Sequence, residues 1–284
     1  MSGRLPAWFK QDIPEPQVMS TMTKLLGELN LNTICHSALC PNITSCYRRK
    51  TATFLILGDV CTRNCAFCAV KKGLPSPIDE EEPHRLLEAV SRLGLDYVVI
   101  TSVTRDDLPD GGASQFAKII SLLRGRDVTV EVLIPDFLGS VRALYMVIAA
   151  RPQVINHNLE TVPRLYPSVR QGADYNCSLK LLCKLKQLAP EIVTKSGLML
   201  GLGETRDEVI EVMRHLREAD CDLLTIGQYL RPSPENHPVV RFVDPEEFSE
   251  LEETGRGMGF TGIASAPLVR SSFKAAELYA QVKA

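Results

Sequence analysis

The sequence predicts an α/β fold, a partial (β/α)6 TIM-like barrel, and two observations indicate it. After residue 50, six apolar runs of strand length alternate with amphipathic segments of helix length. The runs are almost continuously hydrophobic, which is typical of strands buried on both faces of a parallel sheet. Six such units are fewer than the eight of a closed barrel. We therefore expect an open barrel with its helices on the outside.

In chain order, the predicted strands cover residues 54–57, 97–100, 128–134, 154–155, 197–200 and 223–226. Helices are expected where apolar residues recur three and four positions apart, over residues 83–93, 116–123, 141–148, 177–189, 209–216 and 245–257. A further helix at about 19–29 precedes the barrel. These elements divide the chain into an N-terminal extension (1–50), the barrel (51–262) and a C-terminal extension (263–284).

The composition limits the classes of function. At 284 residues the chain fits one large domain, and 45% hydrophobic residues suffice for a substantial core. A net charge of −2 provides no general basic surface for nucleic acid. No apolar run reaches the roughly 18 residues of a membrane span, and the first residues contain no secretory signal. We expect a cytoplasmic protein with no nucleic-acid or membrane partner.

Six of the nine cysteines are concentrated between residues 35 and 68. Disulfides suit small secreted domains, and zinc sites usually combine C-x2-C pairs, which neither group provides. Thiolates grouped in threes suit iron–sulfur clusters, in which one iron then stays open for another ligand. The first triplet is Cys35, Cys40 and Cys46, and the second is Cys61, Cys65 and Cys68.

Polar and glycine-rich strings follow the ends of the predicted strands. In open α/β sheets, ligands bind where the loops after the carboxyl ends of the strands meet. The second cysteine triplet follows the first predicted strand, and the other strings cover residues 106–112, 156–160, 201–204 and 228–229. Their convergence predicts an active site at this edge of the sheet.

The spacing C-x3-C-x2-C of the second triplet resembles the radical S-adenosylmethionine superfamily. The resemblance implies that these cysteines hold three irons of a [4Fe–4S] cluster, whose fourth iron binds S-adenosylmethionine. Cleavage of that cofactor would give a 5′-deoxyadenosyl radical, which the protein positions and shields. The string G-L-M-L-G-L-G-E at 197–204 is similar to the G-x-I-x-G-x-x-E element that lies near the adenine in this superfamily.

A narrower resemblance covers nearly the whole chain. The string C-H-S-A-L-C-P-N-I-T-S-C gives C-x4-C-x5-C, and V-R-S-S-F stands at 269–273. Between them lie I-T-S-V-T-R-D-D-L-P-D-G-G-A, N-H-N-L-E-T-V-P-R-L-Y, T-K-S-G-L-M-L-G-L-G-E and T-I-G-Q-Y-L. The set resembles the lipoyl synthase family. It implies a sulfurtransferase that inserts two sulfur atoms at C6 and C8 of a protein-bound octanoyl-lysine, with the sulfur supplied by an auxiliary [4Fe–4S] cluster.

The resemblance also implies the site residues. In the family, the C-x4-C-x5-C cysteines and the second serine of R-S-S-[YF] hold the auxiliary cluster. An alkoxide is a poorer iron ligand than a thiolate, which suits an iron that must be released. The catalytic residues expected are Cys61, Cys65, Cys68 and Ser272, and the auxiliary ligands are Cys35, Cys40, Cys46 and Ser272. Expected contacts of S-adenosylmethionine are Asp106, Asp107, Asn158, Glu160, Lys195, Gly201 and Glu204. The two clusters are expected to face each other across the mouth of the barrel.

The chain departs from the family pattern beside the first triplet. His36, Ser37 and Ser45 stand where the family usually has glutamates. Because nearby charges and hydrogen bonds tune a cluster, these replacements alter the setting of the auxiliary site without removing a ligand.

The implied partners are octanoylated lipoyl carrier domains, namely the E2 subunits of 2-oxoacid dehydrogenases and the glycine-cleavage H protein. An electron donor such as flavodoxin or ferredoxin and an iron–sulfur carrier that rebuilds the auxiliary cluster are also implied. Two alternatives stay open: another two-cluster radical sulfurtransferase, such as one acting on RNA, and a non-catalytic iron–sulfur carrier protein.

Overall fold

The structure, a computed structural model, describes residues 5–10 and 16–283 and is built on one curved sheet. Eight strands form this sheet in the order β1-β2-β5-β6-β7-β8-β9-β10. All neighbouring pairs are parallel except β1 with β2. The strands are β1 (Asn32–Thr33), β2 (Thr53–Ile56), β5 (Tyr97–Ser102), β6 (Thr129–Leu133), β7 (Val154–Asn156), β8 (Val193–Leu200), β9 (Leu223–Gln228) and β10 (Gly262–Ser265). The order of the parallel strands follows the chain, as in an open TIM-like barrel.

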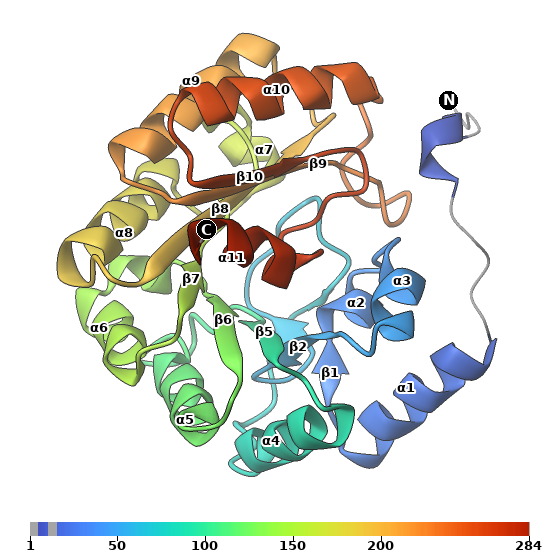
Figure 1. Ribbon diagram of the computed structural model, residues 1–284, viewed down its shortest axis with the longest axis vertical. Helices are drawn as coiled ribbons and strands as arrows, with labels where there is room; N and C mark the ends of the chain where they lie inside the picture. The colour runs from blue at the N-terminus through green and yellow to red at the C-terminus, as the bar shows by residue number, and fades with distance from the viewer. Residues whose placement is uncertain (1–4, 11–15, 284) are drawn as a thin grey trace.

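Helices surround this sheet on its outer side (Figure 1). Those between the parallel strands are α4 (Glu82–Leu93), α5 (Ala113–Leu123), α6 (Val141–Ala150), α8 (Tyr175–Leu188), α9 (Arg206–Glu218) and α10 (Pro245–Gly257). Shorter helical segments are η1 (Ala7–Phe9), η2 (Phe137–Gly139), η3 (Pro163–Leu165) and α7 (Tyr166–Val169). No helix in the described part of the chain is long and apolar enough to cross a bilayer.

The predicted partial barrel is confirmed, and three elements differ from the expectation. A seventh parallel strand, β10, pairs with β9, so the sheet continues past residue 262, where we expected the barrel to end. The loop expected around the first cysteine triplet contains two short helices, α2 (Ile34–Ser37) and α3 (Ile43–Arg48). The N-terminal helix α1 covers Pro16–Glu28, and a C-terminal helix α11 covers Ala275–Lys283.

Helix α11 covers the amino ends of the strands. Leu278 packs with Val154, Val193 and Leu223, which stand at the starts of β7, β8 and β9. The ring of Tyr279 lies 6.0 Å from that of Tyr97 at the start of β5. In the view of Figure 1, α11 and the C-terminus lie over the middle of the ring of strands and helices. The C-terminal extension therefore closes one end of the barrel.

The barrel interior holds a buried ion pair directly beside this closure. Paired residues of a parallel sheet point to the same face, so Asn156 and Lys195 share the interior side. The Lys195 ammonium lies 2.8 Å from Glu131, and both side chains are fully buried. The Tyr97 hydroxyl donates a hydrogen bond of 2.6 Å to the other oxygen of Glu131. Burial and this carboxylate raise the pKa of Tyr97, so the phenol stays a donor.

We expect Lys195→Met to destabilise the protein strongly, because it leaves the Glu131 carboxylate buried without its cation. Breaking one side of such a pair costs about 3–5 kcal/mol of unfolding free energy. The double substitution Lys195→Met with Glu131→Leu should recover most of that loss, since no buried charge remains. Urea unfolding of the iron-free chain measures both. Lys24→Met, which removes an exposed pair with Glu28, is the control, and an equal loss in this control would contradict the prediction.

Candidate functional site

The second cysteine triplet follows the carboxyl end of β2. Cys61 ends the short strand β3 (Val60–Cys61), which pairs with β4 (Lys71–Lys72). Cys65 and Cys68 lie in the turn that follows, where the Cys68 N–H bonds the Cys65 carbonyl. Burial and the neighbouring thiols raise the pKa of Cys68 to about 12. Burial also raises the pKa of Cys65 to about 11, although Arg170 acts in the opposite direction.

The first triplet lies at the opposite, amino end of β2. Cys35 is buried in α2 and hydrogen-bonds Thr53, the first residue of that strand. Cys46 is in α3, and Cys40 lies between the two helices. Burial, together with the charges of Cys40 and Cys46, raises the pKa of Cys35 to about 12. The two triplets therefore flank the ends of one strand. This differs from our expectation that both would face the mouth of the barrel.

The cysteines of both triplets are available as ligands, because all nine cysteines of the chain are free thiols. Among residues 5–10 and 16–283, no three His, Cys, Asp or Glu side chains are arranged to hold a single metal ion. A [4Fe–4S] cluster does not need three ligands around one metal ion, because each thiolate binds a separate iron. The N–H groups of Arg63 and Thr104 also donate to the Cys61 sulfur, as groups around cluster ligands commonly do.

The fold brings the C-terminal extension to the first triplet. The Asn42 side-chain amide donates a hydrogen bond of 2.6 Å to the Leu268 carbonyl. The guanidinium of Arg49 lies 5.3 Å from the centre of the Phe273 ring. Cys40 and Arg270 influence each other's pKa values, and burial lowers the pKa of Arg270. Ser272 stands between these anchors, in the turn before α11.

Arg63, inside the second triplet, binds two carboxylates from neighbouring loops. Its guanidinium makes paired hydrogen bonds of 2.7 and 2.9 Å to Asp106 and two bonds of 2.6 Å to Asp136. Burial alone would raise the pKa of Asp136, but Arg63 outweighs it and lowers that pKa to about 2. The arrangement ties the cysteine loop to the loops after β5 and β6. We call these three side chains the Arg63 clamp.

Several predicted contacts of S-adenosylmethionine are already engaged within the protein. Asp106 belongs to the Arg63 clamp, and Asp107 pairs with Arg105 at 2.9 Å. The Lys195 ammonium pairs with Glu131 and does not reach the carboxyl edge. These three assignments stay predictions.

The remaining predicted contacts gather around β8. The Asn158 amide donates a hydrogen bond of 3.1 Å to Glu160, which pairs with β8 through a bridge to Leu198. Both oxygens of Glu204 accept backbone N–H groups, from Gly201 at 2.6 Å and Leu202 at 2.9 Å. Glu204 thus shapes the turn that follows β8, immediately before the capped start of α9 at Thr205.

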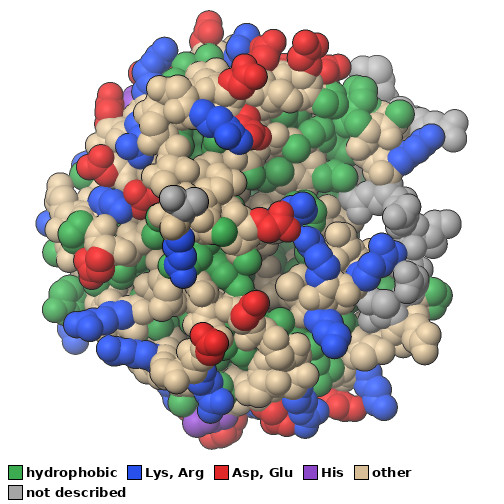
Figure 2. All heavy atoms as spheres, viewed as in Figure 1, with side chains coloured by type: hydrophobic (Ala, Val, Ile, Leu, Met, Phe, Trp, Pro, Cys, Tyr) green, Lys and Arg blue, Asp and Glu red, His purple; other side chains and the backbone are tan. Residues whose placement is uncertain are grey.

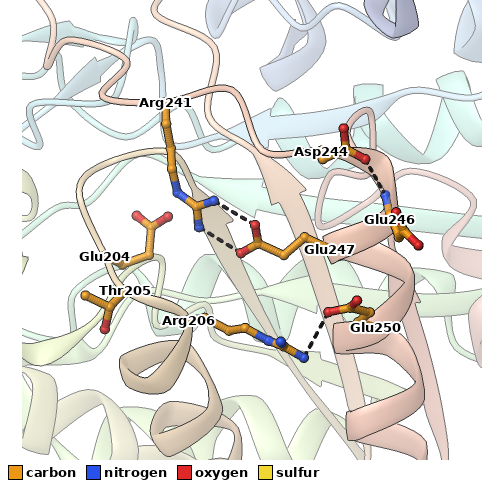
Figure 3. Close-up of a pocket in the computed structure, with 8 residues that line it drawn as sticks. All are labelled: Glu204, Thr205, Arg206, Arg241, Asp244, Glu246, Glu247 and Glu250. Carbon is orange, nitrogen blue, oxygen red and sulfur yellow. Dashed lines mark hydrogen bonds and ion pairs between the residues drawn. The ribbon is translucent and has the colours of Figure 1, made fainter.

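A cavity of about 480 Å³ lies beside this turn, lined by side chains of the α9 and α10 region (Figure 3). Arg241 pairs with Glu247 at 2.7 Å, and Arg206 pairs with Glu250 at 3.0 Å. Its two arginines are thus paired, and Glu204 and Asp244 accept backbone N–H groups of the adjoining turns. None of the cysteines lines it, so we assign it no part in binding the substrate.

Two further buried side chains lie near the second triplet: His157, which belongs to the string at 156–160, and Arg170, which the sequence analysis missed. His157 donates or accepts a bond of 2.8 Å with the Ile134 carbonyl, and burial lowers its pKa to about 4, so the ring is neutral. Arg170 binds the hydroxyls of Tyr166 and Ser178. Burial would lower the pKa of Arg170, but Tyr166 and Glu160 outweigh it and raise it. Its place after a predicted strand indicated His157, whereas no such signal marked Arg170, which follows α7.

The other three cysteines lie outside the triplets. Cys221 is buried, whereas Cys177 and Cys183 are half-buried and line a surface groove on α8. His36 is exposed. Figure 2 shows Lys and Arg side chains over the region of α2 and α3, where Arg48, Arg49 and Lys50 are exposed next to Cys46.

Comparison with known proteins agrees with this geometry. Residues 55–216 match the Radical SAM superfamily. The lipoyl synthase of Caldanaerobacter subterraneus subsp. tengcongensis is 58% identical over 276 residues, which cover 97% of each chain. That of Aquifex aeolicus is 58% identical over 89% of this chain and 93% of its own. That of Geobacter sulfurreducens is 55% identical over 96% of this chain and 90% of its own.

Solved structures share the fold at low identity. HydG, a maturase of the [FeFe]-hydrogenase, superposes with a TM-score of 0.59 and 15% identity over 89% of this chain and 57% of its own. Streptococcus suis SuiB bound to S-adenosylmethionine gives a TM-score of 0.56 and 13% identity over 84% of this chain and 56% of its own. The chain thus spans a little over half the length of these two proteins, and the likeness concerns the fold alone.

We expect Arg63→Met to loosen the second triplet. The substitution leaves Asp136 buried without its cation and should cost about 3–5 kcal/mol of unfolding free energy. A chelator should then remove iron from the Cys61, Cys65 and Cys68 site faster than from the unaltered protein. Arg63→Lys should not restore it, because an ammonium cannot bind two carboxylates in paired fashion. Arg164→Met, which removes an exposed pair with Glu208, is the control, and equal iron loss there would contradict the prediction.

Proposed function

The chain belongs to the lipoyl synthase family of the Radical SAM superfamily, and from this membership we propose which of its residues perform the reaction. The enzyme is a sulfurtransferase that uses S-adenosylmethionine and two [4Fe–4S] clusters. It acts on octanoyl groups carried by lipoyl carrier proteins and inserts sulfur at C6 and C8. The observation that carries the assignment of roles is the position of the two cysteine triplets at opposite ends of β2.

We assign the second triplet to the cluster that binds S-adenosylmethionine. Cys61, Cys65 and Cys68 would hold three irons, and the N–H groups that bond Cys61 would orient that thiolate. The Arg63 clamp would keep the loop fixed while the cofactor enters. Asn158, Glu160, Gly201 and Glu204 stand at the same edge of the sheet and would form the cofactor pocket.

We assign the first triplet, with Ser272, to the auxiliary cluster. Cys35, Cys40 and Cys46 would bind three irons, and the Ser272 hydroxyl would bind the fourth after losing its proton. When bound, the two clusters and S-adenosylmethionine supply the hydrogen-abstracting radical chemistry and the sulfur. The high pKa values of the buried thiols mean that cluster loading must displace their protons, so loading should be faster at higher pH.

The positions of the triplets suggest how the octanoyl chain lies. It would run through the barrel interior, along β2, so that its C6 and C8 stand between the two sites. The side chains around β7 and the C-terminal segment would exclude water from this space. We further propose the E2 subunits of 2-oxoacid dehydrogenases and the glycine-cleavage H protein as carriers.

We also propose two partner proteins for the enzyme and the compartment in which it works. An electron donor such as flavodoxin or ferredoxin would reduce the cluster of the second triplet, and an iron–sulfur carrier would rebuild the auxiliary cluster. The exposed Arg48, Arg49 and Lys50 lie next to Cys46 of the first triplet and offer the iron–sulfur carrier a basic surface. The cytoplasm is the proposed compartment, because nine free thiols suit reducing surroundings.

The test separates the two triplets by their products. The protein is reconstituted anaerobically with iron and sulfide, then given S-adenosylmethionine, reductant and an octanoyl-lysine peptide. Cys61→Ala should abolish formation of 5′-deoxyadenosine, because one ligand of the cofactor-binding cluster is lost. Cys40→Ala should leave 5′-deoxyadenosine formation largely intact and stop sulfur insertion, which peptide mass measures.

Cys183→Ala is the matched control, since this half-buried thiol lies outside both triplets, and it should retain both activities. Thiolated peptide from Cys40→Ala would refute the auxiliary assignment. Absence of cofactor cleavage in the unaltered protein would favour a non-catalytic iron–sulfur carrier, and cleavage without added sulfur would favour another radical enzyme.

A further inference from the structure

The two serines of the R-S-S-F segment have different surroundings. Ser271 accepts a hydrogen bond of 2.6 Å from the Asn156 amide and donates one of 3.0 Å to the Asn158 carbonyl oxygen. Within the described part of the chain, the structure gives the Ser272 hydroxyl no hydrogen bond. A serine can bind iron as an alkoxide only if its oxygen is available and its proton can leave. The oxygen and the proton of Ser271 are both engaged in these bonds, whereas the structure gives no such bond to the Ser272 hydroxyl.

The direction of the bonds to Ser271 follows from the buried charge behind them. The Asn156 amide also lies 3.4 Å from a Glu131 oxygen, so its N–H side must face the carboxylate. The NH2 group of the same Asn156 amide also donates to the Ser271 oxygen, so the proton of the serine hydroxyl points to Asn158. Asn158 in turn donates to Glu160 at 3.1 Å. A continuous series of hydrogen bonds therefore runs from Glu131, through Ser271, to Glu160.

This series is the second of two attachments that fix the segment. The first is at Gly227 in β9, where a Cβ atom would collide with the Val269 carbonyl oxygen and approach Arg270 to 3.3 Å. Gly197 in β8 likewise leaves room for Asn158, because a Cβ atom at Gly197 would lie 2.8 Å from the side-chain oxygen of Asn158. The backbone is thus held at Val269 and the side chain at Ser271, directly before Ser272.

We infer that Ser271 is a positioning residue that sets the place of Ser272 and links the auxiliary site to the loop after β7. The inference rests on the proposed role of Ser272 and deepens it. Asn158 and Glu160 are predicted to contact S-adenosylmethionine, so one hydroxyl joins the sulfur-donating side of the site to the radical-generating side. Ser271 itself touches neither the substrate nor the irons.

The test compares Ser271→Ala with Ser271→Thr in the reconstituted holoenzyme. Ser271→Ala should still cleave S-adenosylmethionine, but the amount of 5′-deoxyadenosine formed per thiolated peptide should rise roughly ten- to thirtyfold, because two hydrogen bonds that place Ser272 are lost. Ser271→Thr keeps the hydroxyl and should restore most of the coupling. A ratio in Ser271→Ala equal to that of the unaltered enzyme would overturn the inference.

A glycine pair tests the same segment without changing a polar group. Gly227→Ala should displace Val269 and raise the same ratio, whereas Gly257→Ala should not, because nothing lies within 4 Å of a Cβ at Gly257. If Ser271→Ala fails to take up iron, recovery by Ser271→Thr and the contrast between the two glycine variants decide the question. Equal effects of both glycine variants would overturn the inference.

The outcome for Ser272 separates this inference from the proposed function. Ser272→Ala should stop sulfur insertion, while cofactor cleavage continues. If Ser272→Ala instead inserts sulfur normally, the proposed ligand is wrong. If Ser271→Ala removes the fourth auxiliary iron and Ser272→Ala does not, Ser271 is itself the ligand, which overturns its positioning role.

Discussion

One long-range hydrogen bond joins the C-terminal segment to the loop of the first cysteine triplet. The Asn42 amide, in the loop of the first triplet, bonds the Leu268 carbonyl at 2.6 Å, across 226 positions of sequence. The chain must complete the sheet through β10 before this bond can be made. The C-terminal segment then lies against Gly227 and ends in α11, which covers the amino ends of the strands. The same C-terminal segment therefore closes the barrel and contacts the first triplet, where we propose the auxiliary site.

The barrel interior is polar next to the end that α11 closes. Glu131 and Lys195 form a fully buried pair, and Tyr97 and Asn156 complete the bonding of the carboxylate. Such a pair contributes little to stability when intact but is costly to break. It therefore restricts the segment that carries Ser271 to one arrangement. At the other end of β2, the Arg63 clamp fixes the cysteine loop by the same means, so buried charges hold both reactive sites in place.

The sequence predicted what depends on local pattern. Apolar periodicity located the strands and outer helices, and cysteine spacing located both triplets. It missed β10, because the short string G-I-A-S at 262–265 forms a strand only by pairing with β9. It named the strings that contain Asn156 and Ser271 but missed Glu131 and the contact among the three, because their meeting depends on the register of strands and on a segment more than 100 positions away. Glu131 could have been noticed only as an acidic residue inside the apolar run at 128–134.

The central claim is that Ser272 completes the auxiliary site, and Mössbauer spectroscopy tests it most directly. The cysteines of the second triplet are replaced by alanine, so that ⁵⁷Fe can enter only the auxiliary site. One iron of the cluster should then differ from the other three, because its ligand is oxygen rather than sulfur. Ser272→Cys should make the four irons alike, and Ser272→Ala should alter the distinct signal. A spectrum that is the same in all three proteins would contradict the account.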